Sequence, residues 1–246
     1  MKAELHTSPI AAAFLSQEEC PFCQLEAEAE KRAIRFFAGA SASYMEPGIR
    51  GLTNRLGFCG GHMKKLYEYG NVLGNALMLQ SHMEDILLEL ENISLPEGTK
   101  SLFRKKSNTA QPVWERLQQR VDSCAICDQL EESVQRHYQT FFSLLAEPEF
   151  REYVENCKGF CLRHFARLLQ EADKKLPQKY AAWFYPTVHR VMKANMVRVQ
   201  ADLTRLVDKH DYRNTGLDWG NSKDSVPRAM QKLSGVNPAE GPYKKE

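Results

Sequence analysis

Cysteines and histidines recur twice along this chain, in the same order and at similar spacing, and this recurrence limits what the chain can fold into. In the first half, the CxxC pair Cys20 and Cys23 is followed by Cys59 and His62 within GFCGGH. The second half repeats the arrangement with CAIC and GFCLRH, whose matching residues are Cys124, Cys127, Cys161 and His164. Two spaced motifs that recur in one order predict an internal duplication.

The stretch before each GFC motif repeats as well. Residues 46–50 read EPGIR and residues 147–151 read EPEFR. A proline after glutamate suits the first turn of a helix, where its missing N–H removes no hydrogen bond. The glycines of the two GFC motifs, Gly57 and Gly159, suit the ends of these short helices.

Helical patterns extend through both halves. Residues 24–38 are rich in strong helix formers, and a long segment with apolar residues at helical spacing follows each CxxH motif. No stretch shows the alternation of a strand bounded by turns. We therefore expect an all-α fold of two duplicated helical units, with the long helices packed as a bundle.

The expected boundaries follow from the repeat and from composition. The first helical repeat is assigned to residues 1–95 and the second to residues 113–208. The linker at 96–112 contains prolines, a glycine and the basic cluster Arg104-Lys105-Lys106. Residues 209–246 form a C-terminal segment that we expect to dock on the helical body.

Each half supplies three thiols and one imidazole, which is the ligand set of a closed tetrahedral zinc site. Cysteine and histidine three residues apart share a helix face, and a helix N-terminus favours thiolate. We therefore predict that each half is pinned by its own Cys3His site and that the chain holds two zinc ions. The predicted ligands are Cys20, Cys23, Cys59 and His62 in one site and Cys124, Cys127, Cys161 and His164 in the other.

Other uses of these cysteines fit less well. A redox CxxC is typical of a βαβ unit, which is not visible here, and haem attachment needs histidine directly after CxxC. An iron–sulfur cluster stays open as the alternative cofactor, although such clusters are usually held by four cysteines. Cys157 lies outside the pattern and is interpreted as a buried or spare thiol.

Composition excludes some classes of function. An odd count of 7 cysteines, with a poor signal peptide at the N-terminus, favours a reducing, cytoplasmic compartment. The apolar runs are far shorter than the ~18–20 residues of a membrane span. The formal charge of +2 gives no electrostatic argument for nucleic acid, and no helix has a dense basic face.

The C-terminal segment carries large aromatic residues among charged ones. A short helix is expected from about Asp224 to a stop at Gly235, with Val226, Met230 and Leu233 as its apolar stripe. One interpretation is that the segment covers core between the repeats. The other is a ligand or partner site formed by Asp211, Arg213, Trp219, Lys223, Asp224 and Arg228.

The combination of motifs resembles an uncharacterised bacterial family of unknown function. The resemblance rests on the duplicated CPxC, EPxxR and GFCxxH motifs and extends from about Cys20 to Gly235. It includes the DYRN sequence at 211–214, the Trp219-Gly220 pair, and KDxxPR at 223–228. It implies a cytoplasmic bacterial protein and no established activity.

Together these observations predict a metal-binding helical protein, with structural zinc, that serves as a binding or interaction module. Its partner is an unknown small molecule or protein, and the long helices allow homo-oligomers. The alternatives are an iron–sulfur or thiol redox protein, and an enzyme with its site near the DYRN and KD residues. An enzyme is the less favoured reading, because motifs such as HExxH and GxSxG are absent from the sequence.

Overall fold

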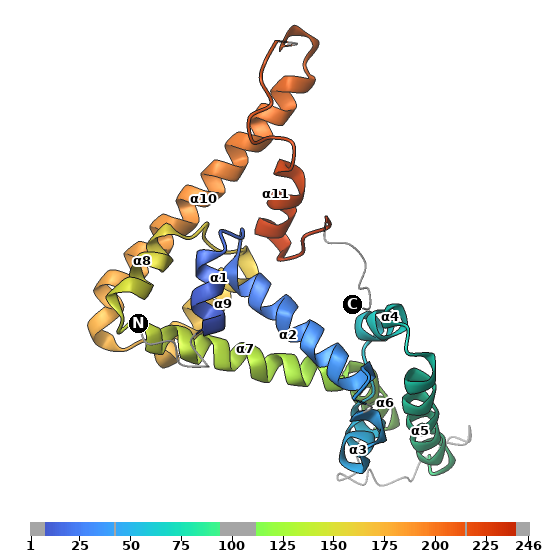
Figure 1. Ribbon diagram of the computed structural model, residues 1–246. Coiled ribbons are helices and arrows are strands. Elements are labelled where there is room, and N and C mark those ends of the chain that lie inside the picture. Colours follow the sequence, from blue (N-terminus) through green and yellow to red (C-terminus); the bar gives the residue numbers. More distant parts are fainter. Residues whose placement is uncertain (1–7, 42, 94–111, 215, 240–246) are drawn as a thin grey trace, which may run out of the picture. The chain divides into compact units, whose positions relative to one another are not determined.

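The structure is a computed structural model and describes residues 8–41, 43–93, 112–214 and 216–239. These residues form helices and connecting turns and contain no strand, so the expected all-α class is confirmed (Figure 1). None of the described helices combines the length and apolar content that crossing a membrane requires.

The helices of the first half follow one another with short connections. They are α1 (Ser8–Leu15), α2 (Pro21–Ala38), α3 (Pro47–Leu56), α4 (Gly60–Tyr69) and α5 (Val72–Glu91), with a 3-10 turn at Ser43–Met45. Pro47 occupies the first turn of α3, and Gly57 ends the helix with a positive φ of 58°. A Cβ at Gly57 would lie 2.6 Å from Nε2 of His82, so the position requires glycine.

The second half contains helices in a matching order. They are α6 (Val113–Asp122), α7 (Ala125–Leu144), α8 (Pro148–Asn156), α9 (Leu162–Lys175), α10 (Ala181–His210) and the additional α11 (Ser225–Ser234), with 3-10 turns at Gln178–Tyr180 and Tyr212–Asn214. Pro148 starts α8 as Pro47 starts α3. Gly235 ends α11 in the left-handed conformation, where the sequence places the stop.

The chain divides into two compact units that do not follow the two halves of the sequence. Unit 1 contains residues up to 29 together with residues 132–241, and unit 2 contains residues 30–131. Each unit therefore combines the beginning of one half with the later helices of the other half. The helices α2 and α7 contribute residues to both units.

Each unit has its own hydrophobic core. In unit 1, Phe14, Phe22, Phe141 and Phe150 pack with ring centroids 5.3–5.8 Å apart, and Tyr138 stacks on Phe22 at 4.4 Å. These offset and edge-on contacts add to the burial of the rings.

The core of unit 2 is built from the second part of α2, from α4 and α5, and from the start of α7. Phe37 of α2 and Phe58 pack edge to face at 5.6 Å. The cores include cysteines of the repeated motifs, because Cys20, Cys23 and Cys161 belong to the core of unit 1 and Cys124 to that of unit 2.

Polar contacts bring the two halves together within unit 2. The guanidinium of Arg120 on α6 binds Asp85 and Glu89 of α5 at 2.7 and 2.9 Å. Ser123 donates to the carbonyl of Leu56 at 2.7 Å. These contacts place the second CxxC motif beside the first GFC motif.

Candidate metal centres

The structure gathers the eight repeated cysteine and histidine residues into two groups of four. We call the group in unit 1 site 1 and the group in unit 2 site 2. Within each group the potential ligand atoms all lie within 4.8 Å of one another. Site 1 consists of Cys20, Cys23, Cys161 and His164, and site 2 of Cys59, His62, Cys124 and Cys127.

This grouping corrects the predicted pairing. The prediction that each half closes its own site is wrong, because each CxxC pair lies beside the CxxH pair of the other half. Two Cys3His clusters are nevertheless present, one in each compact unit. Cys157 lies outside both clusters, where it is buried and donates to the carbonyl of Val154 at 3.2 Å.

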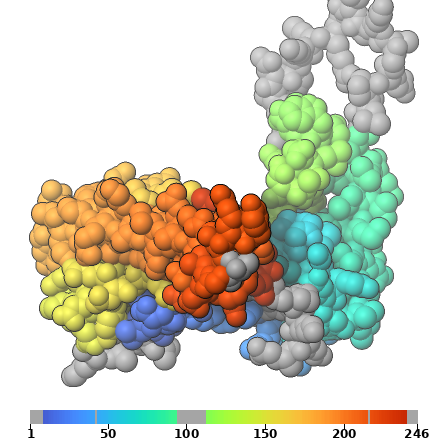
Figure 2. Space-filling view, turned by 90° about the horizontal axis from the view of Figure 1, so that it is seen from above, coloured from blue at the N-terminus to red at the C-terminus, as the bar shows by residue number. Residues whose placement is uncertain are grey.

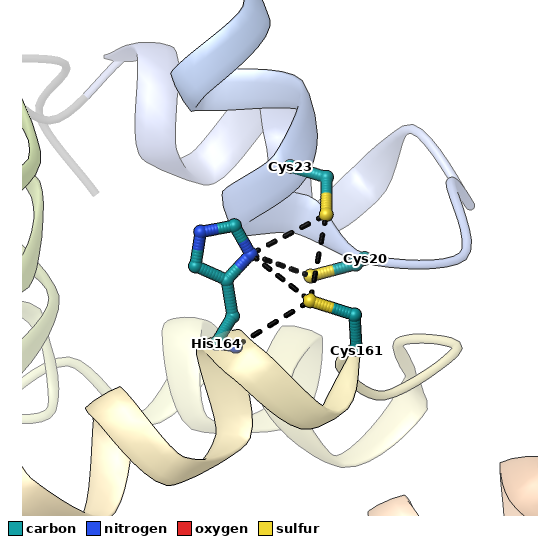
Figure 3. Close-up of side chains that lie close together, drawn as sticks. All are labelled: Cys20, Cys23, Cys161 and His164. Atoms are coloured by element: carbon teal, nitrogen blue, oxygen red, sulfur yellow. Dashed lines mark hydrogen bonds between the residues drawn. The ribbon is translucent and has the colours of Figure 1, made fainter. Parts of the chain in front are cut away.

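All four motifs lie at helix N-termini, as the sequence predicts. In site 1, Cys20 immediately precedes α2, and Cys161 is the N-cap of α9 (Figure 3). In site 2, Cys124 immediately precedes α7, and Cys59 is the N-cap of α4. The second ligand of each pair falls in the first helical turn, so both side chains point to one side. The positive end of each helix dipole favours the thiolate form.

Distances in site 1 match those of a single tetrahedral ion. Nδ1 of His164 lies 3.5, 3.3 and 3.2 Å from the sulfurs of Cys20, Cys23 and Cys161 (Figure 3). The sulfurs of Cys23 and Cys161 are 3.6 Å apart. A tetrahedral zinc with ordinary bond lengths separates two sulfurs by about 3.8 Å, and sulfur from nitrogen by about 3.6 Å.

Site 2 repeats this geometry. Nδ1 of His62 lies 3.3 Å from the sulfur of Cys59, 3.2 Å from that of Cys124 and 3.3 Å from that of Cys127. The sulfurs of Cys59 and Cys127 are 3.8 Å apart. Both sites therefore present three sulfurs and one Nδ1 atom at the corners of a tetrahedron sized for one metal ion.

A carboxylate holds the second nitrogen of each histidine. Nε2 of His62 lies 3.1 Å from Glu30, and Nε2 of His164 lies 3.4 Å from Glu26. A carboxylate on Nε2–H fixes the tautomer that leaves Nδ1 free to bind a metal, and it increases the basicity of the ligand. Sequence reasoning missed both glutamates, because QLEAEAEK reads only as a helix-forming stretch.

The pKa values reflect this crowding of thiols and imidazoles. Burial lowers the pKa of His164, but hydrogen bonds with Cys161, Cys20 and Glu26 outweigh burial and raise it to about 11. The same competition, with Cys124 and Glu30 as partners, raises the pKa of His62 to about 10. Burial raises the pKa of the Cys124 thiol, but the hydrogen bond with His62 and its neighbours lowers it to about 6. A cation bound at the ligand atoms would replace these protons, so metal binding should release protons.

The residues of the predicted C-terminal site take part in separate contacts. Asp211 pairs with Arg213 at 2.5 Å, and Arg228 pairs with Asp224 and with Asp202 of α10 at 2.8 Å. Trp219 lies against His210 with 6.0 Å between ring centroids. Lys223 is exposed. A ligand or partner site at these residues stays a prediction.

The helix α11 packs against α9 and α10. Figure 1 shows α11 beside α10, and Figure 2 shows the orange-red C-terminal segment against the orange of α10. Its expected apolar stripe is not the face it buries, because Val226, Met230 and Leu233 are exposed. The buried face is polar and includes Lys232, which is 1% exposed. Nζ of Lys232 donates to the carbonyl of Glu19 at 2.5 Å and to that of Lys158, and it lies 3.2 Å from the Glu19 carboxylate. Burial lowers the pKa of Lys232, whereas the nearby charge of Glu19 raises it, and burial has the larger effect.

Comparison with known proteins places the chain in a family. A model described as "Family of unknown function (DUF6062)" matches residues 1–240. The chain belongs to this family. It is 21% identical over 206 residues to a protein of Caldicellulosiruptor sp. (strain Rt8B.4) named "Uncharacterized 23.9 kDa protein in xynA 3'region". That similarity covers 82% of this chain and 88% of the relative. No solved structure matches the chain.

Proposed function

We propose that this family member is a zinc-stabilised helical protein of the bacterial cytoplasm that serves as an interaction module. Site 1 and site 2 each hold one zinc ion. The observation that carries the proposal is the shared geometry of the two clusters, with three sulfurs and one Nδ1 atom at tetrahedral spacing. All seven cysteines are free of disulfides, which fits a reducing compartment.

The spacing favours a single ion over an iron–sulfur cluster. Ligand atoms within 4.8 Å of one another surround one metal atom. An iron–sulfur cluster distributes its protein ligands over two or more iron atoms and is usually held by cysteines alone. Three thiolates with one neutral imidazole are a common ligand set of structural zinc.

A structural role follows from the number of ligands. Catalytic zinc sites use three protein ligands and keep a position for water or substrate, whereas structural sites supply four. In each cluster the four ligands connect two helices that are far apart in sequence. A metal ion there would hold α2 to α9 in unit 1, and α4 to α7 in unit 2.

We propose further that the chain arose by duplication, as the sequence motifs predict. The helices α3, α4 and α5 are followed in order by α8, α9 and α10, and proline begins both α3 and α8. The crossed ligand pairing is what a swap of the first helices between two copies of one unit would produce.

An exposed face of α5 supports the role in interaction. Five apolar residues recur at helical spacing along this face, and all are exposed. They are Val72, Leu79, Met83, Leu87 and Leu90. Such spacing suits helix pairing, and we propose that the same face of a second copy is the partner.

Light scattering after size exclusion tests this pairing. The wild type should elute as a dimer, and Met83→Glu should yield a monomer because it buries an unpaired charge at the interface. Gln200→Glu adds the same charge at an exposed position of α10, outside the α5 face, and should preserve the dimer. A monomeric wild type at high concentration would overturn the homodimer.

Metal analysis tests the central proposal. Protein purified without oxygen should contain two zinc ions per chain and show no visible absorption. Iron together with visible absorption would show that the sites hold an iron–sulfur or iron-thiolate centre rather than zinc. Fully helical protein without any metal would contradict the proposal.

A further inference from the structure

The two sites differ in their access to solvent. In site 1 all four ligands are buried, and Cys20 and Cys161 have no exposed surface. In site 2 only His62 and Cys124 are buried, while Cys59 is half-buried and Cys127 is exposed. The ligand sets are identical, so the difference comes from what lies over the sulfurs.

Site 1 is covered by the end of α11. The carbonyl oxygen of Gly235 lies 3.5 Å from the sulfur of Cys23. A Cβ at Gly235 would lie 3.4 Å from the sulfur of Cys161. The positive φ of Gly235, 82°, turns the chain over the cluster just where α11 ends. No carbonyl within the described residues of unit 2 makes such a contact with a sulfur of site 2.

Exposure of a ligand decides how a bound ion can leave. In a closed tetrahedral site, an incoming donor must reach the metal before a protein ligand departs. At site 1 that approach requires α11 to move, which is a local opening of the fold. At site 2 the side of Cys127 is already open to solvent.

We propose that site 1 holds its ion until the fold opens locally, whereas site 2 exchanges its ion directly with thiolate donors of other molecules. In the exchange step the incoming thiolate bonds to Zn²⁺ and the bond to the sulfur of Cys127 breaks. The released Cys127 thiolate takes a proton from solvent. The ion stays divalent throughout, so the step needs no oxidant or reductant. This inference rests on the proposed binding of one metal ion in each cluster.

Loss of the ion from site 2 would also make unit 2 less ordered. Cys59 and His62 begin α4, and Cys124 and Cys127 begin α7. Loss of the ion frees these two helix ends from each other. The core of unit 1 contains none of these residues, so it should stay folded while site 2 is empty.

Rapid mixing of the zinc-loaded full-length protein with the chelator 4-(2-pyridylazo)resorcinol tests the inference. Release should occur in two phases of one ion each, with the first at least about tenfold faster because it needs no local opening. A pulse of iodoacetamide after the first phase should label Cys59, Cys124 and Cys127 and spare the cysteines of site 1. Release in a single phase, or equal labelling of Cys20 and Cys161, would overturn the inference. A protein that contains no metal before mixing would instead contradict the proposed function.

A matched pair of variants tests the cover over site 1. Lys232→Met removes the buried amine that ties α11 to Glu19, so the slow phase should accelerate and the fast phase should stay unchanged. Lys223→Met removes an exposed lysine from the same segment and should alter neither rate. Cleavage of α11 by trypsin in Lys232→Met would show that the helix has detached. A slow phase that stays unchanged in that detached variant would exclude α11 as the cover.

Discussion

Site 1 and site 2 have the same ligands and almost the same distances, yet they lie in different surroundings. Site 1 is part of an aromatic core and lies under the end of α11. Site 2 lies at the edge of a smaller core and exposes Cys127. The repeated motif thus determines how the three sulfurs and the imidazole nitrogen are arranged, while the packing around it determines how far solvent reaches them.

The long helices of the two units, α10 and α5, also differ in the residues that they expose to solvent. On α10 the exposed positions include His189, Arg190 and Lys193, together with Val197 and Val207. On α5 the exposed positions include Leu79, Met83 and Leu87. Unit 2 therefore leaves accessible both an apolar face of its long helix and a cysteine of its cluster, whereas unit 1 buries its cluster and exposes an apolar stripe on the short helix α11.

The largest expected effect comes from removing one ligand at each site. Structural zinc contributes about 10–16 kcal/mol of apparent binding free energy in small domains, so loss of a ligand should unfold the surrounding unit. Cys161→Ser should release one ion and expose the amides of unit 1 to hydrogen exchange, and Cys59→Ser should do the same in unit 2. Mass spectrometry of zinc content and amide exchange measures both effects.

The spare thiol provides the control for these variants. Cys157→Ser should retain two ions, because Cys157 belongs to neither cluster. The location of the lost protection tests the crossed pairing. If Cys59→Ser exposed the amides around Cys20 rather than those around Cys124, pairing within each half would be correct after all.

A cut between the two halves of the sequence should show which of the two sites can hold the resulting pieces together. A protease site inserted between Gly98 and Thr99 leaves two pieces that share both clusters. The pieces should remain associated after cleavage and separate when a chelator removes both ions. In the Cys59→Ser background site 1 alone should hold them together, whereas site 2 alone, in Cys161→Ser, should release them. Size exclusion detects each outcome, and separation without chelator would contradict the crossed arrangement.

The ligands and the helices could be predicted from the sequence, but the partners within each cluster could not. The CxxC and CxxH spacing identifies all eight residues, and both pairings use the same residues at the same positions. The helix lengths do not decide between them. The helix α2 carries the chain about 27 Å from the first CxxC and α3 returns at most about 15 Å, but the chain between the two helices is long enough to cover the rest.

The spacing of apolar residues also failed to predict which face of α11 is buried. A helical apolar stripe predicts the buried side only where apolar contacts drive docking. Here Lys232 and Arg228 reach Glu19 and Asp202, which come from distant parts of the chain. Only the three-dimensional structure shows that a buried carboxylate and two carbonyls satisfy the lysine.

The contribution of α11 to stability should depend on this polar face; the described residues of unit 2 contain no counterpart of this helix. Lys232→Met leaves the buried Glu19 with fewer partners, and breaking a buried ion pair in this way costs about 3–5 kcal/mol. Leu233→Ala shortens an exposed side chain and should change stability by less than about 0.5 kcal/mol. Urea unfolding, with trypsin cleavage of α11 as a second readout, compares them. A larger effect of Leu233→Ala would show that α11 docks through its apolar stripe rather than through its polar face.

The smallest expected effect concerns the two carboxylates behind the histidines. Loss of a carboxylate that orients a metal-binding histidine typically lowers metal affinity by about 10–100-fold. Glu26→Ala and Glu30→Ala should both fall within this range, because the side chains of His164 and His62 are only 4% and 8% exposed and water cannot easily replace either carboxylate. Glu28→Ala is the control on the same helix, since Glu28 pairs with Gln24 and contacts neither histidine. Competition with a calibrated zinc chelator measures the affinities, and equal values for all three variants would show that neither carboxylate supports its site.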